Sequence, residues 1–383
     1  MKMEEWKECK LSDICDYGKD RIEVSSLDNS NYISTENMLP NRAGITTATT
    51  LPTGELTPSF EIDDTLVSNI RPYFKKIWKA TFSGGCSADV LVFKAKENVS
   101  KEYLYYVLAD DEFFKYSMAT SKGTKMPRGD KTSIMNYPVN LPPLPTQKKI
   151  ARILSSLDDK IELNNKINTN LEQQAQALFK NWFVDKYEKE GTIGDYCSVK
   201  SGFAFKSSWW QDEGTKVIRI GDIEQGCLNL ETCAHVADDK IEDAKDFIVR
   251  GGDLVIAMTG ATIGKFSMIP KTKEPILVNQ RVGKFFLGNN PLEKVPFIYC
   301  TLKQEEVITE FINRGQGSAQ PNISTGDILS IPCWIPNEIE IDNFNKTIQP
   351  MFETIISNQE ENRKLSVLRD SLLPKLMNGE FFK

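Results

Sequence analysis

The chain of 383 residues contains one internal repeat, and a repeat of this length constrains the fold more than any single motif does. An offset of 194 residues aligns glycine, proline, asparagine and apolar positions over about 75 residues. The matches include Gly123 with Gly317, Pro127 with Pro321, Pro138 with Pro332, Asn164 with Asn358, and Leu178 with Leu372. Nearer the start the offset is 189, which pairs Asp64 with Asp253 and indicates a small insertion in the second copy. The sequence therefore predicts two copies of one structural unit.

Each copy is predicted to begin with a mixed α/β domain, and these domains cover residues 1–145 and 190–336. Both are rich in turn-forming Gly, Pro and Asn, and they contain short β-rich runs at 65–68, 90–93, 216–220 and 254–257. We expect one amphipathic helix in each domain, near 101–118 and 295–313. We interpret the proline-rich stretches 138–145 and 332–336 as linkers, because proline cannot continue a helix or a central strand.

A long helix is predicted to follow each domain, within residues 146–189 and 337–383. The first helix is expected to run from about 146 to 187. The second opens on a capping-box-like pattern at 337–340 and meets a stop signal at Asn378 and Gly379, and Pro374 should end or kink it. The predicted fold class is therefore α+β, with two repeated domains separated by two long helices.

Both helices carry apolar and asparagine residues at alternating spacings of four and three, which is typical of a coiled-coil seam. The predicted seam consists of Ile161, Asn164, Asn168, Leu171 and Leu178 in the first helix and Ile355, Asn358, Asn362, Leu365 and Leu372 in the second. An antiparallel pairing in which residue numbers sum to 526 sets asparagine against asparagine, and only Leu157 against Arg369 is mismatched. A shift by one heptad would leave buried amides unpaired, at about 1–3 kcal/mol each. The alternative is that each helix packs only on its own domain.

An antiparallel pair would place the two domains at opposite ends of a rod, related by a pseudo-twofold axis. Two similar domains at a fixed separation are suited to reading two separate sites on one DNA duplex, as dimeric DNA-binding proteins do. Because the two domains differ in sequence, we expect the two half-sites to differ as well.

Composition excludes several classes of protein. The single histidine, His235, excludes most multi-histidine zinc sites and the His-Glu-x-x-His protease helix. The eight cysteines include no Cys-x-x-Cys pair, which is typical of reduced thiols in a cytosolic protein. The net charge of −6 excludes a uniformly basic coat but not a local basic site. There is no apolar signal core and no run near the roughly 20 apolar residues of a membrane span, so we expect a cytoplasmic protein without a membrane partner.

No motif predicts catalysis by this chain. The stretch 260–266 (GATIGKF) has three residues between its glycines where a phosphate-binding P-loop has four, and Phe266 stands where Ser or Thr would bind magnesium. Neither a Gly-x-Gly-x-x-Gly after a strand nor the Asn/Asp-Pro-Pro-aromatic motif of adenine methylases is present. We therefore expect no catalytic residue, no metal site and no cofactor in this chain.

A glycine-containing polar loop follows the amphipathic helix in each copy and is the best candidate for DNA contact. Lysine and arginine neutralise phosphates, while Arg, Gln and Asn can read base edges. In the first copy the candidates are Lys122, Thr124, Lys125, Arg128 and Lys131, and in the second they are Arg314, Gln316, Ser318, Gln320 and Asn322. Weaker candidates elsewhere are Arg71, Lys75, Lys76, Lys200, Lys206 and Arg219. The alternative is that each loop only closes its domain and that the basic residues are solvated.

These stretches resemble the DNA-specificity subunit of type I restriction-modification systems. The likeness rests on residues 31–38 (NYISTENM), 141–147 (LPPLPTQ), 201–206 (SGFAFK), 217–222 (VIRIGD) and 317–324 (GSAQPNIS). It covers essentially the whole chain, and the order of the motifs is more specific than any one of them. The first copy departs from the pattern at Thr124–Arg128, where TKMPR replaces Ser-x-Gln-Pro-Asn.

The resemblance implies two target-recognition domains joined by two spacer helices. Each domain would read half of an asymmetric bipartite sequence in double-stranded DNA, and the helices would set the unread gap. Two modification subunits, carrying S-adenosylmethionine and adenine-methylation chemistry, would dock on the chain, and two restriction subunits using ATP and magnesium would join them. The adenines would be flipped out by the partners. Two other classes remain open: a self-contained enzyme, disfavoured by the missing motifs, and a coiled-coil adaptor whose heads bind proteins.

Overall fold

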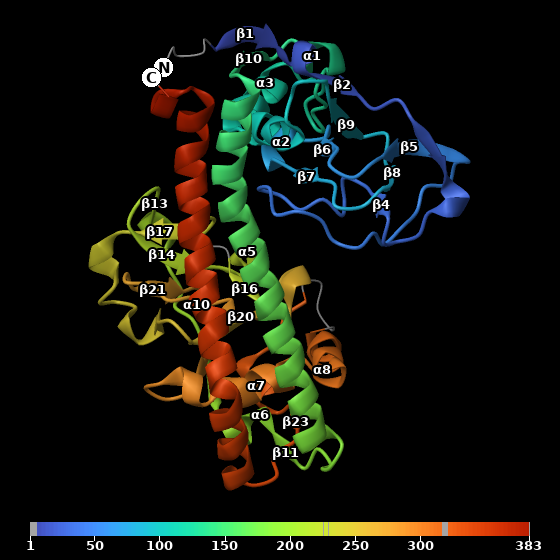
Figure 1. The fold of residues 1–383 in the computed structure, drawn as a ribbon. Helices are drawn as coiled ribbons and strands as arrows, with labels where there is room; N and C mark the ends of the chain where they lie inside the picture. The colour runs from blue at the N-terminus through green and yellow to red at the C-terminus, as the bar shows by residue number, and fades with distance from the viewer. Residues whose placement is uncertain (1–5, 225, 229, 316–320, 383) are drawn as a thin grey trace. The chain divides into compact units, whose positions relative to one another are not determined.

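The computed structural model describes residues 6–224, 226–228, 230–315 and 321–382. The chain divides into two compact units (Figure 1), the first formed by residues 1–160 with 365–383 and the second by 161–364. The two long helices contribute to both units, since each unit boundary falls within them. Within the described residues, no helix combines the length and the apolar character that spanning a membrane requires.

Unit 1 is built on two four-stranded sheets and one two-stranded pair. The strand orders are β2-β9-β6-β7, β3-β5-β8-β4 and β1-β10. The strands are β1 (Lys7–Lys10), β2 (Cys15–Tyr17), β3 (Arg21–Glu23), β4 (Tyr32–Ile33), β5 (Leu56–Phe60), β6 (Thr65–Ser68), β7 (Ile77–Lys79), β8 (Gly84–Cys86), β9 (Val90–Ala95) and β10 (Pro138–Leu141). The short helices are α1 (Leu11–Ile14), α2 (Lys101–Ala109), α3 (Asp111–Ala119) and α4 (Lys131–Ile134).

Unit 2 repeats the first four-stranded sheet and the terminal two-stranded pair, and its second sheet has five strands. The strand orders are β12-β22-β19-β20, β13-β17-β14-β21-β18, β11-β23 and β15-β16. The strands are β11 (Gly191–Thr192), β12 (Ser198–Ser201), β13 (Trp210–Gln211), β14 (Thr215–Ile218), β15 (Ile223–Glu224), β16 (Cys227–Leu228), β17 (Ala234–Val236), β18 (Ile248–Val249), β19 (Leu254–Ala257), β20 (Phe266–Met268), β21 (Ile276–Val278), β22 (Val282–Phe286) and β23 (Pro332–Cys333). The short helices are α6 (Ile193–Tyr196), α7 (Val295–Leu302), α8 (Glu305–Gly315) and α9 (Thr325–Leu329). The predicted repeat of an α+β unit is therefore confirmed.

Two details of the prediction were wrong. The single amphipathic helix expected in each domain is two helices, α2 with α3 and α7 with α8. In unit 1 the break is at Asp110, whose extended backbone (ψ 142°) ends α2 and whose carboxylate accepts from the Glu112 N–H to cap α3. The proline-rich stretches are not plain linkers, because Pro138 and Pro332 lie in β10 and β23, which pair only with β1 and β11. Proline is tolerated there because a two-stranded pair leaves one side of each strand free.

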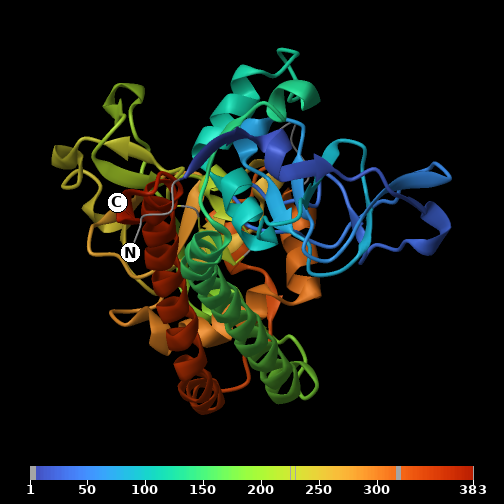
Figure 2. The ribbon, with the colours of Figure 1, turned by 45° about the horizontal axis from the view of Figure 1, so that its top comes forward.

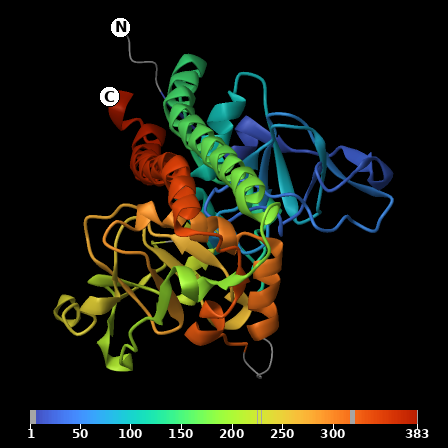
Figure 3. The same cartoon turned by 90° about the horizontal axis from the view of Figure 1, so that it is seen from below.

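The two long helices are α5 (Leu144–Phe179), which a π-helical turn extends over Lys180–Val184, and α10 (Glu338–Met377). They lie side by side (Figure 2 and Figure 3). The Glu340 N–H donates to the Asn337 side chain, as the capping pattern predicts. Pro374 does not end α10, which continues to Met377, and Gly379 (φ +73°) follows the helix in the left-handed conformation that glycine adopts readily.

Asparagine pairs join the two helices within unit 2. Asn164 Nδ2 donates to Asn362 Oδ1 at 2.8 Å, and Asn358 Nδ2 donates to Asn168 Oδ1 at 2.8 Å. In both pairs the residue numbers sum to 526, and the reversed order of the pairs makes the helices antiparallel. Asn164 is fully buried, so a shifted register would leave its amide without this partner.

The mismatch expected at Arg369 is resolved within unit 1. The Arg369 guanidinium reaches Asp158 at 2.8 Å, and the Tyr106 hydroxyl donates to the same carboxylate at 2.7 Å. Burial opposes the charge on Arg369, but its interactions with Asp158 and Asp370 outweigh burial and raise its pKa. A seam position that is apolar elsewhere therefore holds an ion pair here.

We expect a disulfide to form when Asn164 and Asn362 are both replaced by cysteine. The two side chains are in hydrogen-bond contact, so oxidation should give a compact, faster-migrating chain on non-reducing gels. The matched control pairs Asn164→Cys with Ile355→Cys, which would meet only after a shift of one heptad. Cross-linking of the control alone would contradict the register. Native thiols interfere little, because six of the seven cysteines whose side chains are described are buried.

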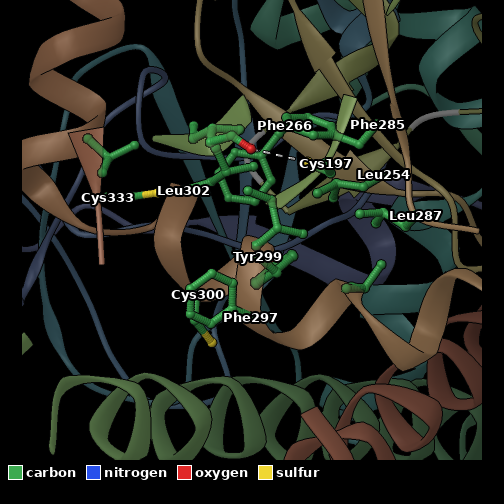
Figure 4. Close-up of a cluster of buried hydrophobic side chains, with 14 of the residues drawn as sticks. Cys197, Leu254, Phe266, Phe285, Leu287, Phe297, Tyr299, Cys300, Leu302 and Cys333 are labelled. Atoms are coloured by element: carbon green, nitrogen blue, oxygen red, sulfur yellow. Dashed lines mark hydrogen bonds between the residues drawn. The ribbon is translucent and has the colours of Figure 1, made fainter. Parts of the chain in front are cut away.

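A buried cluster in unit 2 fixes the helices to the domain. It gathers side chains from the β12-β22-β19-β20 sheet, from α7 and from the inner face of both long helices. Figure 4 shows part of it, including Phe266 and Phe285 of the sheet and Phe297 and Tyr299 of α7. The ring centroids of Phe266 and Tyr299 lie 5.1 Å apart. Burial of the apolar surface of these side chains stabilises the packing of the sheet against α7.

Candidate nucleic-acid interface

Three segments of unit 1 meet at the end of its β2-β9-β6-β7 sheet. In the segment after β6, the Asn69 N–H donates to the carbonyl oxygen of Asp89, in the turn before β9, at 2.8 Å. In the same segment, the Arg71 N–H donates to the carbonyl oxygen of Pro127, in the loop before α4, at 2.8 Å. The carbonyl oxygen of Asn69 accepts from the N–H of Gly129, in that same loop, at 3.2 Å. Residues 127–129 of the polar loop are therefore fixed against the segment after β6, while residues 122–126 are exposed.

Unit 2 forms the same edge with the same hydrogen bonds. Met258 N donates to Arg281 O at 3.0 Å, Gly260 N to Pro321 O at 2.9 Å, and Ile323 N to Met258 O at 2.9 Å. The bridge between Thr259 and Asn322 in unit 2 matches the one between Ile70 and Arg128 in unit 1. We call this place the loop edge of each unit. It consists of residues 69–71, 89 and 127–129 in unit 1 and of residues 258–260, 280–281 and 321–323 in unit 2.

The matched hydrogen bonds establish which side chains occupy equivalent positions. Asp89 of unit 1 corresponds to Arg281 of unit 2, and Arg128 corresponds to Asn322. The backbone framework is thus shared, while the chemistry that it presents differs between the two units.

An ion pair covers the loop edge of unit 1. Arg128 donates through Nε and Nη2 to the two carboxylate oxygens of Asp89, at 3.1 and 3.2 Å. Lys122 lies 2.6 Å from Asp130, and its hydrogen bond lowers the pKa of that carboxyl to about 2. Half of the positive charge predicted for this loop is therefore neutralised by acidic neighbours. Of the other candidates in the loop, Thr124, Lys125 and Lys131 are exposed.

A hollow of about 590 Å³ occupies the loop edge of unit 2. Its polar rim includes the exposed side chains of Gln280, Arg281 and Asn322, which carry the donors and acceptors that read base edges. Among the residues that the structure describes, Arg281 has no acidic partner and the buried Thr259 Oγ1 has no hydrogen-bond partner. The remaining lining comes from Ser201, Met258, Thr259, Pro321, Ile323, Ser324 and Thr325.

The capping residues explain why the loop turns here in both units. Ser324 accepts from Asp327 N, and the Asp327 carboxylate accepts from Ser324 N, so a capping box starts α9. In unit 1 Asp130 accepts from Ser133 N and starts α4 in the same way.

The weaker basic candidates of unit 1 lie in one strained turn. Arg71 and Lys75 both adopt left-handed backbone (φ +50°), where unit 2 has Gly260 and Gly264. Each such residue costs roughly 1–2 kcal/mol relative to glycine. Lys75 reaches Asp111 at 2.8 Å; burial of Asp111 opposes its ionisation, but hydrogen bonds from Lys75 and Arg42 outweigh burial and lower its pKa.

Lys76, at the end of this turn, also has a partner within the protein. Its Nζ donates to Thr35 O at 2.6 Å, and burial lowers its pKa. Lys75 and Lys76 are thus held by protein partners, whereas the neighbouring Tyr73 and Phe74 are exposed with ring centroids 4.6 Å apart.

In unit 2 the remaining basic candidates have neighbours in the protein. Arg314 donates to Glu310, Asp327 O and Ser330, and so ties α8 to α9. Arg219 donates to Thr232 O, while Lys200 and Lys206 lie over the rings of Phe286 and Trp209. Gln316, Ser318 and Gln320 fall outside the described residues.

Three residues of the loop edge were missed by sequence reasoning: Asp89, Gln280 and Arg281. They lie in the turns before β9 and β22, and no motif marks these turns. The apolar runs of β9, β21 and β22 beside these turns were the available signal, since turns between strands are where polar side chains become exposed.

Comparisons with known proteins agree with the repeated architecture. The family model described as "Type I restriction modification DNA specificity domain" matches residues 3–173 and again 185–368. The specificity subunit of the type I restriction enzyme HindI from Haemophilus influenzae is 25% identical over an alignment that covers 99% of this chain and all of that protein. The MjaIX specificity subunit of Methanocaldococcus jannaschii is 27% identical and covers 74% of this chain and 70% of its own length.

A solved structure shares the fold. The type I restriction-modification S subunit from M. genitalium superposes with a TM-score of 0.55 and 17% identity, over 98% of this chain and 97% of that one. Within the described residues, no group of three or more His, Cys, Asp or Glu side chains is arranged to hold a metal ion.

Proposed function

The chain belongs to the family of type I restriction modification DNA specificity domains, and we propose that its two loop edges read the two halves of one asymmetric bipartite DNA target. It is a DNA-specificity subunit and not itself an enzyme, as its relatives are named specificity subunits. Residues 1–145 and 190–336 would be the recognition domains, and 146–189 and 337–383 the spacer helices.

One observation carries this proposal. The two loop edges share their backbone hydrogen bonds but present different side chains, with Asp89 and Arg128 in one and Arg281 and Asn322 in the other. A shared frame with different donors and acceptors is what two readers of different half-sites require. The antiparallel asparagine pairs would hold the helices in one register, and hence the unread gap at one length.

The chemistry would be supplied by partner subunits. Specificity subunits of this kind act with modification and restriction subunits, and we propose two of each on this chain, in the cytoplasm. S-adenosylmethionine, ATP and magnesium would be held by those partners. Apolar residues exposed on the long helices are candidates for docking these partners, among them Leu163 and Ile167 in unit 2 and Val367 and Leu368 in unit 1.

The deciding experiment is sequencing of adenine methylation in a host without its own DNA methylation. The host would express this chain with its modification subunit, and the control host would lack this chain. We expect methylation at one split, asymmetric motif only when the chain is present. Exchange of residues 190–336 for those of another family member should then change the second half of the motif and leave the first half intact.

The alternative, an adaptor that binds proteins through its two domains, predicts a different result. Methylation would then be absent although the modification subunit is expressed and bound. Binding by the chain would also depend little on salt, whereas contacts with phosphates make affinity for DNA fall steeply as salt rises.

A further inference from the structure

We propose that Asp89 and Arg128 act as one reading pair for a cytosine and a guanine, and that Arg281 and Asn322 are the corresponding specificity-determining residues in unit 2. The Asp89 carboxylate would accept from the cytosine N4 amine, and Arg128 would donate to guanine O6 and N7. In unit 2, Arg281 would face a guanine and Asn322 an adenine. This inference rests on the proposed function and specifies which bases each loop edge selects.

The geometry of the pair leaves both partners able to bind a base. Arg128 uses Nε and Nη2 toward Asp89, so the hydrogens of Nη1 and one of Nη2 remain for another acceptor. Each Asp89 oxygen has accepted one of these bonds and keeps a further lone pair. The side chains of Arg128 and Asp89 are 54% and 34% exposed, so the pair lies at the surface where a duplex could reach it.

A contribution to the stability of the fold does not explain why a carboxylate, that of Asp89, stands at the loop edge of unit 1. An exposed ion pair of this kind contributes little to the stability of a fold, because water and salt screen the two charges. Unit 2 forms the same edge with Arg281 in the position of Asp89, and the backbone hydrogen bond from the preceding segment is kept. The framework therefore accepts either charge at this position.

Simple binding of phosphates does not explain the carboxylate either. A negative charge at a surface that contacts DNA is repelled by the phosphates, so it lowers sequence-independent affinity. A carboxylate is favourable against DNA where it accepts from an exocyclic amine, and cytosine N4 is the partner that Asp and Glu use in the major groove. The acidic residue at the loop edge of unit 1 thus points to base reading.

The test compares methylation motifs of the assembled modification complex containing wild-type chain, Asp89→Ala or Arg281→Ala. With Asp89→Ala we expect the first half-site to accept other bases at one position. The preference for the cognate base there should fall about 5- to 150-fold, the equivalent of about 1–3 kcal/mol. With Arg281→Ala the same should happen at one position of the second half-site only.

Lys115→Ala is the matched control, because it removes an exposed ion pair with Glu112 from α3 of the same unit. Its motif should equal that of the wild type. If Asp89→Ala abolishes all methylation, Asp89→Asn decides, since it keeps the size of the side chain and removes the charge. An unchanged motif in either Asp89 variant, with methylation rising or falling equally at all sites, would overturn the inference. Absence of any split motif with the wild-type chain would instead refute the proposed function.

Discussion

Replacement of Gln280, Arg281 and Asn322 together by alanine is expected to lower the affinity of the modification complex for its cognate duplex about 100-fold or more. All three side chains are exposed on the rim of the unit 2 hollow, and each carries the groups that pair with base edges. A base contact of this kind contributes about 1–3 kcal/mol, and the lower value for all three gives about 3 kcal/mol. Titration of a labelled duplex by fluorescence anisotropy measures the change.

The salt dependence of binding separates two roles of Arg281. If its guanidinium reads a base, Arg281→Ala should weaken cognate binding and leave the slope of log affinity against log salt nearly unchanged. If it neutralises a phosphate, the magnitude of the slope should fall by about 1 and binding to all sequences should weaken alike. Lys245→Ala, which removes an exposed ion pair with Glu242 elsewhere in unit 2, is the control and should leave affinity within twofold.

The repeated fold could be predicted because its signals are local. Proline, glycine and asparagine mark the turns of each copy, and the spacing of apolar residues marks the strands β6, β9 and β19 close to their observed bounds. The breaks between α2 and α3 and between α7 and α8 could not be predicted in this way. Apolar residues continue at helical spacing across Asp110, and only its capping hydrogen bond reveals the break.

The loop edge depends on contacts between distant residues, so only part of it could be predicted. Arg128 was identified as a cation in a polar loop, but Asp89 lies 39 residues away and its contribution becomes visible only in the fold. Arg314 shows a contact of another kind that sequence alone does not reveal, since this basic residue donates to Asp327 O and Ser330 and so connects α8 to α9. Residue type indicates what a side chain can bind. The packing around the side chain decides whether its hydrogen-bonding groups are taken by other protein groups or stay accessible to a ligand.

Replacement of Phe179 by alanine is expected to destabilise unit 2 by about 3–5 kcal/mol, the cost of deleting a fully buried aromatic ring. Phe179 is 0% exposed, and its ring centroid lies 5.2 Å from Phe183, 5.6 Å from Phe297 and 5.7 Å from Phe344. These partners come from the π-helical turn, α7 and α10, so one ring joins both long helices to the body of the domain. The variant should lose hydrogen-exchange protection in α7 and in the unit 2 part of α10 first.

The control for Phe179→Ala is Ile312→Ala on α8, where the side chain is 49% exposed and its loss should cost less than about 0.5 kcal/mol. Guanidinium titration of both variants gives the comparison. A loss below about 1 kcal/mol for Phe179→Ala would mean that the surrounding rings close the cavity, and that the helices do not depend on this cluster for their attachment. With the expected loss, the variant should also fail to select the second half-site, because the loop edge of unit 2 is carried by the same sheet, β12-β22-β19-β20, that packs against this cluster.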